Sequence, residues 1–327
     1  MKDIKLYNNV NNTFKKKIIF HVGTGAGFYS EINGMLTAML YCYVHRIKFI
    51  LYADDANFAG GNGWNEFFMP FCQQSHDRLN HRYNMRSRYE GENIPFYSLG
   101  RLALKLRNGV NYLTDDIFGK ACLGNYSRET TAAKWQEFHI DGDINKEFVK
   151  LRSVALHYNR KTFAEIKEMI EKLKLPAHYY SVQFRGGDKT LEVTNPMDVD
   201  YVIERIKNLD IKIDNIFIFS DDYYYVDEIK RKCPEWNVYT LTRQSEHGYI
   251  NSDFNKCNKF SKRREMIKLF AMTEICLHSD IHFGCEVACV NDYIKNIKSP
   301  DKYRAVWTED DAVLKDGFGT KMQQQYG

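Results

Sequence analysis

The feature that most constrains the fold of this chain is a regular alternation of short apolar runs with amphipathic helix patterns. Near the start, residues 16–22 read as a buried strand, residues 28–46 as an amphipathic helix and residues 48–53 as a second strand. The pattern weakens between residues 56 and 159, where Asn, Gly, Arg and aromatic residues predict short helices and long loops. Strands separated by helices predict an α/β fold whose strands run parallel.

The same alternation resumes after residue 160. The predicted strands of this second half are residues 179–184, 215–220, 236–242 and 275–283. The predicted helices are residues 161–174, 196–209, 223–232, 261–274 and 286–297. We therefore expect an N-terminal Rossmann-like domain with helical insertions at 1–175, a second Rossmann-like domain at 176–297, and a tail at 298–327 that returns to the first domain.

Composition and charge argue against several classes of protein. The 327 residues suffice for about two domains, and 44% hydrophobic with 27% charged residues is ordinary for a globular protein. A net charge of +4 is too small for broad contact with a phosphate backbone, so we expect no nucleic acid partner. The apolar stretch 35–44 is about half of the roughly 20 residues that a membrane-spanning helix needs, so we expect no membrane span. Eight cysteines without a C-x-x-C pair indicate a reduced protein, which we expect in the cytoplasm.

A glycine-rich turn follows the first predicted strand. Ligands of open α/β sheets bind beyond the carboxyl ends of the strands, so this turn is a candidate site. Gly23, Gly25 and Gly27 resemble a dinucleotide fingerprint, although Phe28 stands where its third glycine would be. With Asp54 on a ribose, the turn could bind a nicotinamide cofactor. The alternatives are a tight strand-to-helix turn, or an anion or sugar contact at the start of the helix.

The predicted strand 179–184 runs into the sequence RGGDK. Arg185 at a strand end offers two-pronged donors for phosphate oxygens, and Lys189 adds a second cation. Gly186 and Gly187 would let a ligand approach the backbone. The alternative is a structural turn in which Arg185 pairs with Asp188.

Two further loops carry charges of one sign. Asp221 and Asp222 end a predicted strand and could bind Mg²⁺ or Mn²⁺, or else cap the helix that follows. Lys262, Arg263 and Arg264 stand at the start of a predicted helix, where the helix dipole disfavours cations unless an anion binds. A solvated basic face is the alternative for this cluster.

His282 and Glu286 lie near the end of the last predicted strand. An imidazole and a carboxylate there could take part in acid–base chemistry. A buried histidine that is satisfied by its neighbours is the alternative.

Together these segments resemble the alpha-1,6-fucosyltransferase family, within the O-fucosyltransferase-like group of glycosyltransferases. The turn at 23–27 and the sequence GNGWNEFFMP at 61–70 resemble the family's glycine-rich turn and its GGW-E-F-P segment. The sequence VQFRGGDK at 182–189 is similar to the family's donor motif HVRRTDK. Residues 218–222, 261–264 and 279–289 resemble its T-D-D strand end and closing phosphate loop.

The resemblance implies a GT-B fold, in which two Rossmann-like domains with mostly parallel sheets face each other across a cleft. The first domain would lie on the acceptor side and the second would bind the nucleotide sugar. The implied activity is an inverting, metal-independent transfer of fucose from GDP-fucose to a glycan hydroxyl, without a cofactor. Arg185 would hold the β-phosphate, while Asp188 and Lys189 would line the sugar end. Asp222 would lie near the nucleotide, and residues 279–282 would flank the pyrophosphate.

Two positions depart from the family's donor motif. Gly186 stands where the family has a second arginine, and Gln183 where it has a histidine. These changes leave other donors open, such as UDP-xylose or another GDP-sugar. They also leave open a protein that binds a nucleotide sugar without transferring it.

A physical mechanism follows from the same loops. A nucleoside diphosphate leaves with growing negative charge, which fixed cations stabilise best in a site shielded from water. Arg185 with Lys189, helped by Arg263 or Arg264, could do this without a metal ion, and Asp188 or Glu192 could accept the proton of the acceptor hydroxyl. The predicted catalytic residues are Arg185, Asp188, Lys189 and Glu192; the predicted donor-binding residues are Gly23, Gly25, Gly27, Arg185, Asp221, Asp222, Arg263, Arg264, Ser279 and His282.

Overall fold

The computed structural model of the protein describes residues 2–23, 25–86, 91, 93–123 and 134–312. The chain divides into two compact units, one that ends at Thr162 and one that begins at Phe163. The division lies within helix α8 (Arg160–Lys172), before the boundary predicted after residue 175. Each unit has its own sheet and is described by itself.

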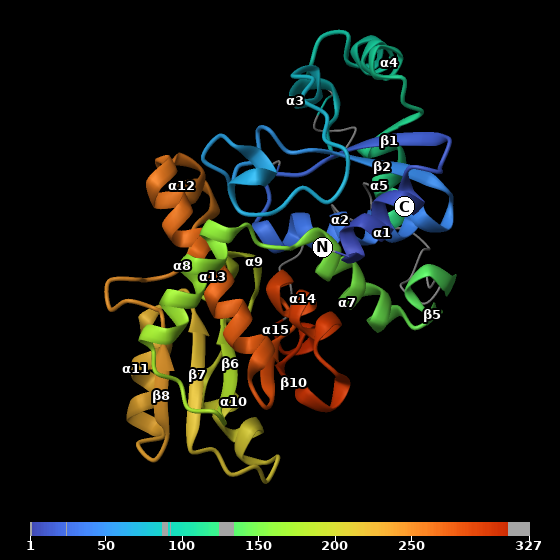
Figure 1. The fold of residues 1–327 in the computed structure, drawn as a ribbon. Helices are drawn as coiled ribbons and strands as arrows, with labels where there is room; N and C mark the ends of the chain where they lie inside the picture. Colours follow the sequence, from blue (N-terminus) through green and yellow to red (C-terminus); the bar gives the residue numbers. More distant parts are fainter. Residues whose placement is uncertain (1, 24, 87–90, 92, 124–133, 313–327) are drawn as a thin grey trace. The chain divides into compact units, whose positions relative to one another are not determined.

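The first unit is built on a three-stranded parallel sheet in the order β2-β1-β3 (Figure 1). Its strands are β1 (Lys16–His21), β2 (Ile47–Tyr52) and β3 (Tyr112–Leu113). Helix α2 (Phe28–Val44) joins β1 to β2 and buries a face that includes Met35, Leu36 and Met39. Parallel strands are covered on both faces, which is why residues 18–20 of β1 and 49–52 of β2 are apolar and buried.

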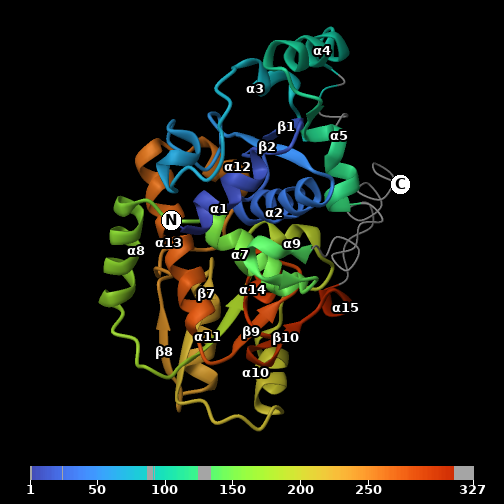
Figure 2. The same ribbon diagram turned by 45° about the vertical axis from the view of Figure 1, so that its right-hand side comes forward.

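Short helices and loops fill the rest of the first unit, as the weak pattern between residues 56 and 159 predicted. The helices are α1 (Lys2–Asn11), α3 (Leu79–Tyr83), α4 (Tyr97–Asn108), α5 (Thr114–Phe118) and α7 (Ile144–Ala155). Strands β4 (Lys134–Trp135) and β5 (Ile140–Asp141) form a small antiparallel pair. Buried aromatic rings, among them Trp64, Phe67 and Phe68, hold the long loop after β2 in place. Figures 1 and 2 show α3 and α4 side by side at one end of this unit.

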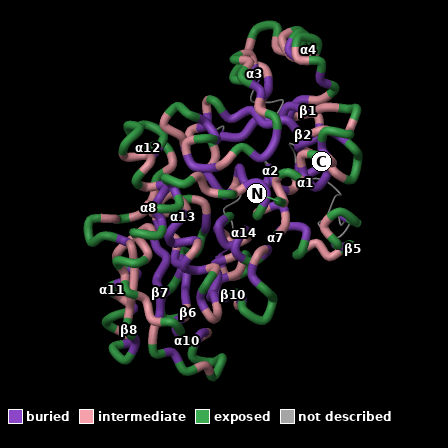
Figure 3. The backbone as a smooth tube through the Cα atoms, in the orientation of Figure 1, coloured by how far each residue is buried: buried purple, intermediate pink, exposed green. Residues whose placement is uncertain are grey.

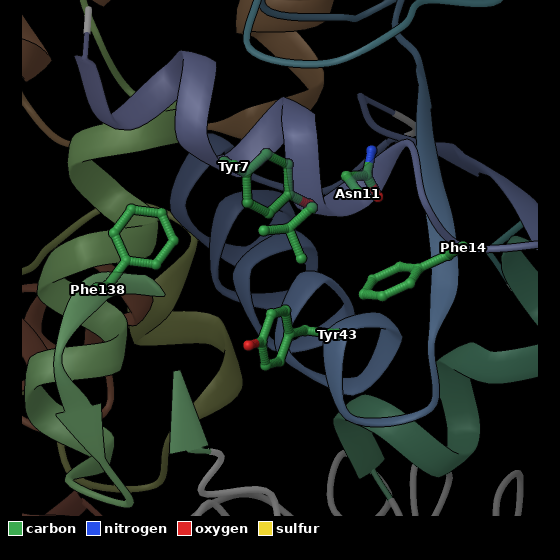
Figure 4. Close-up of a pocket in the computed structure, with 6 residues that line it drawn as sticks. Tyr7, Asn11, Phe14, Tyr43 and Phe138 are labelled. Carbon is green, nitrogen blue, oxygen red and sulfur yellow. The ribbon is translucent and has the colours of Figure 1, made fainter. Parts of the chain in front are cut away.

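A hollow between α1, α2 and the segment at Phe138 is lined by aromatic side chains (Figure 4). The rings of Tyr7, Phe14, Tyr43 and Phe138 face it, and Asn11 lies at its edge. The space is too narrow for a water molecule. We therefore treat it as a packing feature and not as a ligand site.

The second unit is built on a five-stranded parallel sheet in the order β10-β9-β6-β7-β8. Its strands are β6 (Tyr180–Phe184), β7 (Asn215–Ser220), β8 (Asn237–Thr240), β9 (His282–Cys285) and β10 (Tyr303–Trp307). Figure 3 shows β6 and β7 mostly buried, as β9 is, whereas the edge strand β8 has no buried residue. The predicted fold class, α/β with parallel sheets, is confirmed in both units.

Helices cover both faces of this sheet. The helices of the second unit are α9 (Lys189–Glu192), α10 (Val199–Lys207), α11 (Tyr223–Lys232), α12 (Asn251–Lys256), α13 (Lys259–His278), α14 (Cys289–Ile297) and α15 (Glu309–Ala312). One face of the sheet, with Val182 and Ile218, packs on α10 and α11. The alternate residues of the strands, such as Ser181 and Gln183, face the other side, toward α13 and α14. No helix among the described residues is both long enough and apolar enough to cross a membrane.

One predicted strand of the second unit was wrong, and the first part of the predicted tail belongs to this unit. The predicted strand 275–283 is the last turn of α13 followed by β9, because Met272, Ile275 and Cys276 continue the buried face of that helix. Residues 298–312 of the predicted tail belong to the second unit, since β10 pairs with β9 and buries Val306 and Trp307 in the second core. The rest of the predicted tail, residues 313–327, lies outside the described residues.

Candidate functional site

Arg185 follows the carboxyl end of β6, next to Asp221 at the end of β7. Its guanidinium donates to Asp188 at 2.7 Å through Nη2 and forms an ion pair with Asp221 through Nη1. The ring of Tyr249 lies beneath it, with its centroid 5.2 Å away. Arg185 therefore pairs with Asp188, as the structural interpretation of the turn predicted, and a second carboxylate holds it from the other side.

The two carboxylates also fix the backbone around Arg185. Asp221 accepts from the backbone N–H groups of Gly186 at 2.8 Å and of Tyr249 at 2.9 Å. Asp188 accepts from the backbone N–H of Asn251 at 3.0 Å. Each of the four oxygen atoms of these carboxylates thus has a partner. The loop after β6 and the loop at 248–251 are tied together through them.

Gly187 is required by this contact between the two loops. Its φ is +56°, and a Cβ atom on it would lie 2.1 Å from the carbonyl oxygen of Tyr249. Gly248, at φ +100°, lies against Gly187 in the same way. Gly186 is less crowded, because an added Cβ would meet Asp222 at 3.3 Å. The sequence predicted that Gly187 makes room for a ligand, whereas in the structure it makes room for the chain itself.

Lys189 and Glu192 form a third ion pair, 2.5 Å long, on the short helix α9. Both are partly buried, with side chains 22% and 29% exposed. The segments that directly follow β6 and β7, residues 185–192 and 221–222, thus carry two cations, Arg185 and Lys189, against four carboxylates, those of residues 188, 192, 221 and 222. These segments have a net charge of −2, so a diphosphate here would have to displace ion pairs or use the N–H donors that remain.

Asp222 caps helix α11. Its Oδ1 accepts from the backbone N–H of Tyr224 at 3.0 Å, which confirms the capping interpretation of the predicted Asp221–Asp222 pair. Among the described residues, no group of three or more His, Cys, Asp and Glu side chains has the arrangement of a metal site. The two aspartates therefore hold the protein backbone and Arg185.

The basic cluster at the start of α13 is divided between two ion-pair networks. Arg263 donates to Glu165 of α8 at 2.8 Å and is 14% exposed. Arg264 is about half exposed and contacts Glu265, which also accepts from Arg243 at 2.8 Å. Arg243 belongs to the loop after β8, so Arg264 borders the same edge of the sheet as Asp222. The structure does not bring Arg263 and Arg185 into contact.

Ser279 and His282 lie at the opposite edge of the sheet from Arg185. His282 begins β9 and pairs in register with Ser181, four residues before Arg185, a distance of about 13 Å along a strand. Its Nδ1 bonds Ser181 at 2.8 Å and its Nε2 bonds Asn291 at 2.7 Å. Burial lowers the pKa of His282 to about 4, so the imidazole is neutral. The predicted contact of these two residues with a pyrophosphate has no support in this geometry, and the buried, satisfied histidine is what the structure shows.

Of the segment 279–289 that resembles a closing phosphate loop, only residues 286–289 follow β9 and lie at the carboxyl edge. The strand ends two residues later than predicted, so Glu286 and the start of α14 stand at this edge. A hollow of about 420 Å³ lies there, lined by Glu286, Asp292, Lys295, Thr308, Glu309 and Asp310. Lys295 pairs with Glu286 at 2.5 Å. With four carboxylates against one lysine, this hollow repels a diphosphate.

The glycine turn of the first unit is tight. Gly23 has φ +97°, and a Cβ on it would lie 2.4 Å from the Cα of Ala56. Its N–H donates to the buried carboxylate of Glu31 at 3.2 Å. Gly25 and Gly27 have open space where a Cβ would stand, and Gly27 is the N-cap residue of α2. The tight-turn interpretation thus holds for Gly23, whereas the space at Gly25 and Gly27 leaves a ligand contact possible there.

A histidine–carboxylate cluster at the carboxyl edge of the first sheet was missed. His21 at the end of β1 bonds Asp55, which follows β2, at 2.9 Å, and Asp55 bonds His81 of α3 at 2.5 Å. Nearby, His76 bonds Asp54 at 2.9 Å. The sequence contained part of the information needed to predict this cluster, since His21 ends one predicted strand and Asp54 and Asp55 follow the next strand. His76 and His81 could not be added to it, because they come from a segment without a clear pattern.

No model of a known protein family matches this chain, and no curated protein matches it. Its structure, however, is similar to crystal structures of the alpha-1,6-fucosyltransferase NodZ. For NodZ co-crystallised with GDP the TM-score is 0.52 at 13% identity, over 87% of this chain and 93% of that one. The chain has the fold of NodZ. For NodZ from Bradyrhizobium the TM-score is 0.51 at 12% identity, over 87% and 94% of the two chains, and for NodZ soaked with GDP-fucose it is 0.51 at 13% identity, over 87% and 93%.

The NodZ fold agrees with the expected GT-B class, because the chain has two α/β units, each with a parallel sheet. The match extends over both units and not over one Rossmann-like domain alone. At this level of identity the likeness is one of fold. The roles of individual residues therefore depend on the geometry of the loops described above.

Proposed function

We propose that this protein is a glycosyltransferase that takes a sugar from a nucleoside diphosphate sugar, with GDP-fucose as the donor, and transfers it with inversion to a glycan hydroxyl. The observation that carries the proposal is the shared fold with NodZ, which was crystallised with GDP and soaked with GDP-fucose. The polar loops at the carboxyl ends of β6 and β7 stand where ligands of open α/β sheets bind, and they support it. Unpaired cysteines among the described residues fit a reducing compartment, and we propose the cytoplasm.

Arg185 would bind the diphosphate with donors that its own ion pairs leave available. A guanidinium has five N–H donors, and the hydrogen bond to Asp188 and the ion pair with Asp221 engage one terminal nitrogen each. The carboxylates would thus orient the guanidinium before the donor arrives, and such prior orientation strengthens stabilisation of a leaving group. Lys189 would supply the second positive charge after it separates from Glu192. No metal ion takes part in this proposal.

The direct test is ligand-induced thermal stabilisation with GDP, UDP, NAD and CoA in parallel. GDP should raise the melting temperature, and Arg185→Ala should weaken GDP binding and turnover at least about tenfold. Arg185→Lys should restore little of the GDP binding and turnover, because lysine lacks the planar guanidinium that can bind two phosphate oxygens at once. Arg231→Ala is the matched control, since Arg231 is an exposed arginine of the same unit, paired with Glu228. No stabilisation by any nucleoside diphosphate would refute the proposal.

One observation favours a second candidate, a protein that binds a nucleotide sugar without transferring it. Gly186 leaves the site without a second arginine, and the cations that remain are held by carboxylates. Such a site binds a diphosphate less strongly than one with free cations. Release of GDP from GDP-fucose, or of UDP from UDP-xylose, in the presence of defined oligosaccharides would exclude this candidate and identify the donor.

A further inference from the structure

Helix α4 of the first unit has an apolar face that is exposed. Thirteen large hydrophobic side chains are exposed among the described residues. Four of them lie within the eleven residues 96–106 and are 53% to 81% exposed, namely Phe96, Leu99, Leu102 and Leu106. Single exposed apolar residues are ordinary on a protein surface, whereas a group of them marks an interaction site.

The three leucines form a stripe along one side of α4. Leu99, Leu102 and Leu106 are spaced by three and four positions, so the leucine stripe is about 10 Å long. Leu104 lies on the opposite side of the helix and is fully buried in the core of the first unit. An ordinary surface helix has its apolar residues on the buried side and polar residues on the other. Helix α4 has leucines on both sides.

The buried side of α4 fixes the helix in place. Gly100 packs on the ring of Tyr83 of α3, where no room is left for a Cβ atom. Arg101 donates to Asp116 of α5 at 2.7 Å. These contacts and the burial of Leu104 attach the helix to α3, to α5 and to the sheet. The leucine stripe therefore has a fixed position on the side of α4 that faces away from the core.

Exposed arginines lie beside the leucine stripe. Residues 78–108 contain seven Arg and Lys and two Glu, a net charge of +5 in a chain whose total is +4. Arg78 at the start of α3 and Arg82 on α3 are exposed, and among the described residues neither has a carboxylate partner. Arg107, near the end of α4, is 69% exposed, whereas its partner Asp77 is only 11% exposed. The other described cations of this segment are paired with carboxylates. The charge that α3 and α4 expose to solvent is therefore positive.

We propose that α4 and the arginines beside it form a surface that docks on an anionic lipid bilayer. The leucine stripe and Phe96 enter the boundary between headgroups and acyl chains, and Arg78, Arg82 and Arg107 contact the lipid phosphates. An exposed apolar helix face bordered by basic residues is typical of a helix that lies in the plane of a membrane interface. Basic side chains next to such a face are attracted to anionic lipids. The surface belongs to the first unit alone and does not depend on the reaction proposed above.

The charges and the composition of this surface favour a bilayer over two other occupants. In a symmetric dimer the same patch meets itself, so the arginines of two copies would lie close together and repel each other. In protein interfaces the residues that carry most of the binding energy are enriched in Trp, Tyr and Arg, and leucine is under-represented among them. An anionic bilayer supplies both the negative charge for the arginines and the apolar environment for the leucine stripe.

The first experiment is flotation of the full chain with vesicles of phosphatidylcholine, alone or with about one third phosphatidylserine. The chain should bind the anionic vesicles at low salt and bind phosphatidylcholine alone weakly. Binding should fall at least about tenfold as NaCl rises from about 0.05 M to about 0.5 M, because salt screens the attraction between arginines and headgroups. Absence of binding to the anionic vesicles at low salt would overturn the proposal.

Two phenylalanine variants form a matched pair for the apolar part of the surface. Phe96 and Phe260 are almost equally exposed, at 81% and 78%, but Phe260 lies in the second unit. Phe96→Gln should weaken binding to anionic vesicles about tenfold, and Phe260→Gln should bind like the wild type. A loss of binding in Phe260→Gln but not in Phe96→Gln would place the surface in the second unit and overturn the proposal.

A double leucine variant tests the stripe itself. Leu99→Gln with Leu106→Gln should weaken vesicle binding at least about tenfold. The melting temperature should stay unchanged, because both side chains are exposed in the folded protein. Vesicle binding equal to that of the wild type would show that α4 does not enter the bilayer and would overturn the proposal.

The arginines are tested by Arg78→Gln with Arg82→Gln. The control is Arg46→Gln with Arg160→Gln, which removes two exposed arginines of the same unit and lowers the net charge equally. The first double variant should bind anionic vesicles more weakly and with less dependence on salt, whereas the control should bind like the wild type. Equal binding and equal salt dependence in the two double variants would overturn the proposal.

Sedimentation velocity without lipid tests the other occupants. The mass of the wild type should equal that of Leu99→Gln with Leu106→Gln. A dimer that this double variant dissociates, in a protein that does not bind vesicles, would show that a second copy covers the leucine stripe and would overturn the proposal. Absence of both this dimer and vesicle binding would leave a protein partner as the occupant and would also overturn it.

Discussion

Acid should destabilise the second unit through His282. This side chain is fully buried between Ser181 and Asn291, and burial lowers its pKa from 6.5 to about 4. In the unfolded chain the imidazole takes up a proton near pH 6.5, so between pH 6.5 and 4 the unfolded state binds more protons than the folded one. The stability that a neutral His282 provides is therefore complete above pH 6.5 and is lost as the pH falls toward 4.

The magnitude follows from the size of the pKa change. A difference of about 2.5 pKa units at 1.36 kcal/mol each gives about 3 kcal/mol in total. Between pH 7.5 and pH 5 about 2 kcal/mol of this should be lost, because the unfolded imidazole is almost fully protonated at pH 5 while the folded one is still mostly neutral.

The assay is urea unfolding at pH 7.5 and pH 5, followed by hydrogen exchange of peptides from β6 and β9 so that the second unit is measured by itself. Between pH 7.5 and pH 5 the free energy of unfolding of the wild type should fall by about 2 kcal/mol more than that of His282→Gln. His178→Gln, an exposed histidine of the same unit, should lose as much as the wild type. Equal losses in the wild type and in His282→Gln would show that His282 is not held neutral by the fold.

Three further predictions concern the loops of the second unit and the chemistry of transfer. Gly187→Ala should lower the free energy of unfolding by more than about 1 kcal/mol, because Gly187 has a positive φ and an added Cβ would collide with the carbonyl oxygen of Tyr249. Gly25→Ala is the control and should change the free energy of unfolding little, because no atom lies close to the added Cβ. Urea unfolding measures both variants. Asp222→Ala removes the cap of α11 and should cost about 0.5–2 kcal/mol in the same assay, and a cost near zero would contradict the capping role. Transfer should survive EDTA and fall in Arg263→Ala or Arg264→Ala; loss of activity on chelation, with both variants as active as the wild type, would instead indicate a metal site.

Much of the fold could be predicted because its signals are local. An apolar run of five or six residues, a turn and an amphipathic stretch of a dozen or more predict a strand and a helix on their own, as they did for β1, α2 and β2. The order of these elements then limits the sheet to parallel strands. The prediction was wrong where a short apolar run is compatible with both a helix and a strand. The last turn of α13 is such a run, and it was predicted as the start of a strand.

The candidate site was only partly predictable. That Arg185 and Asp221 stand at strand ends follows from the sequence, since the carboxyl ends of parallel strands lie at one edge. The sequence does not show whether a charged side chain at that edge is available to bind a ligand or is already paired with another side chain. Asp188 and Asp221 hold Arg185, and Glu165 holds Arg263, through contacts that span 3, 36 and 98 positions of the chain.

The sequence by itself determined the class of this fold, the positions of most strands and the edge of each sheet where polar loops gather. Tertiary structure alone decided which charges are already paired, that His282 is a neutral core residue, and that His21, Asp55 and His81 form one chain of hydrogen bonds. The physical reason is the range of the interactions. Helix and strand patterns depend on neighbours a few residues apart, whereas the proton and charge states of a side chain depend on whatever the fold brings within about 3 Å of it.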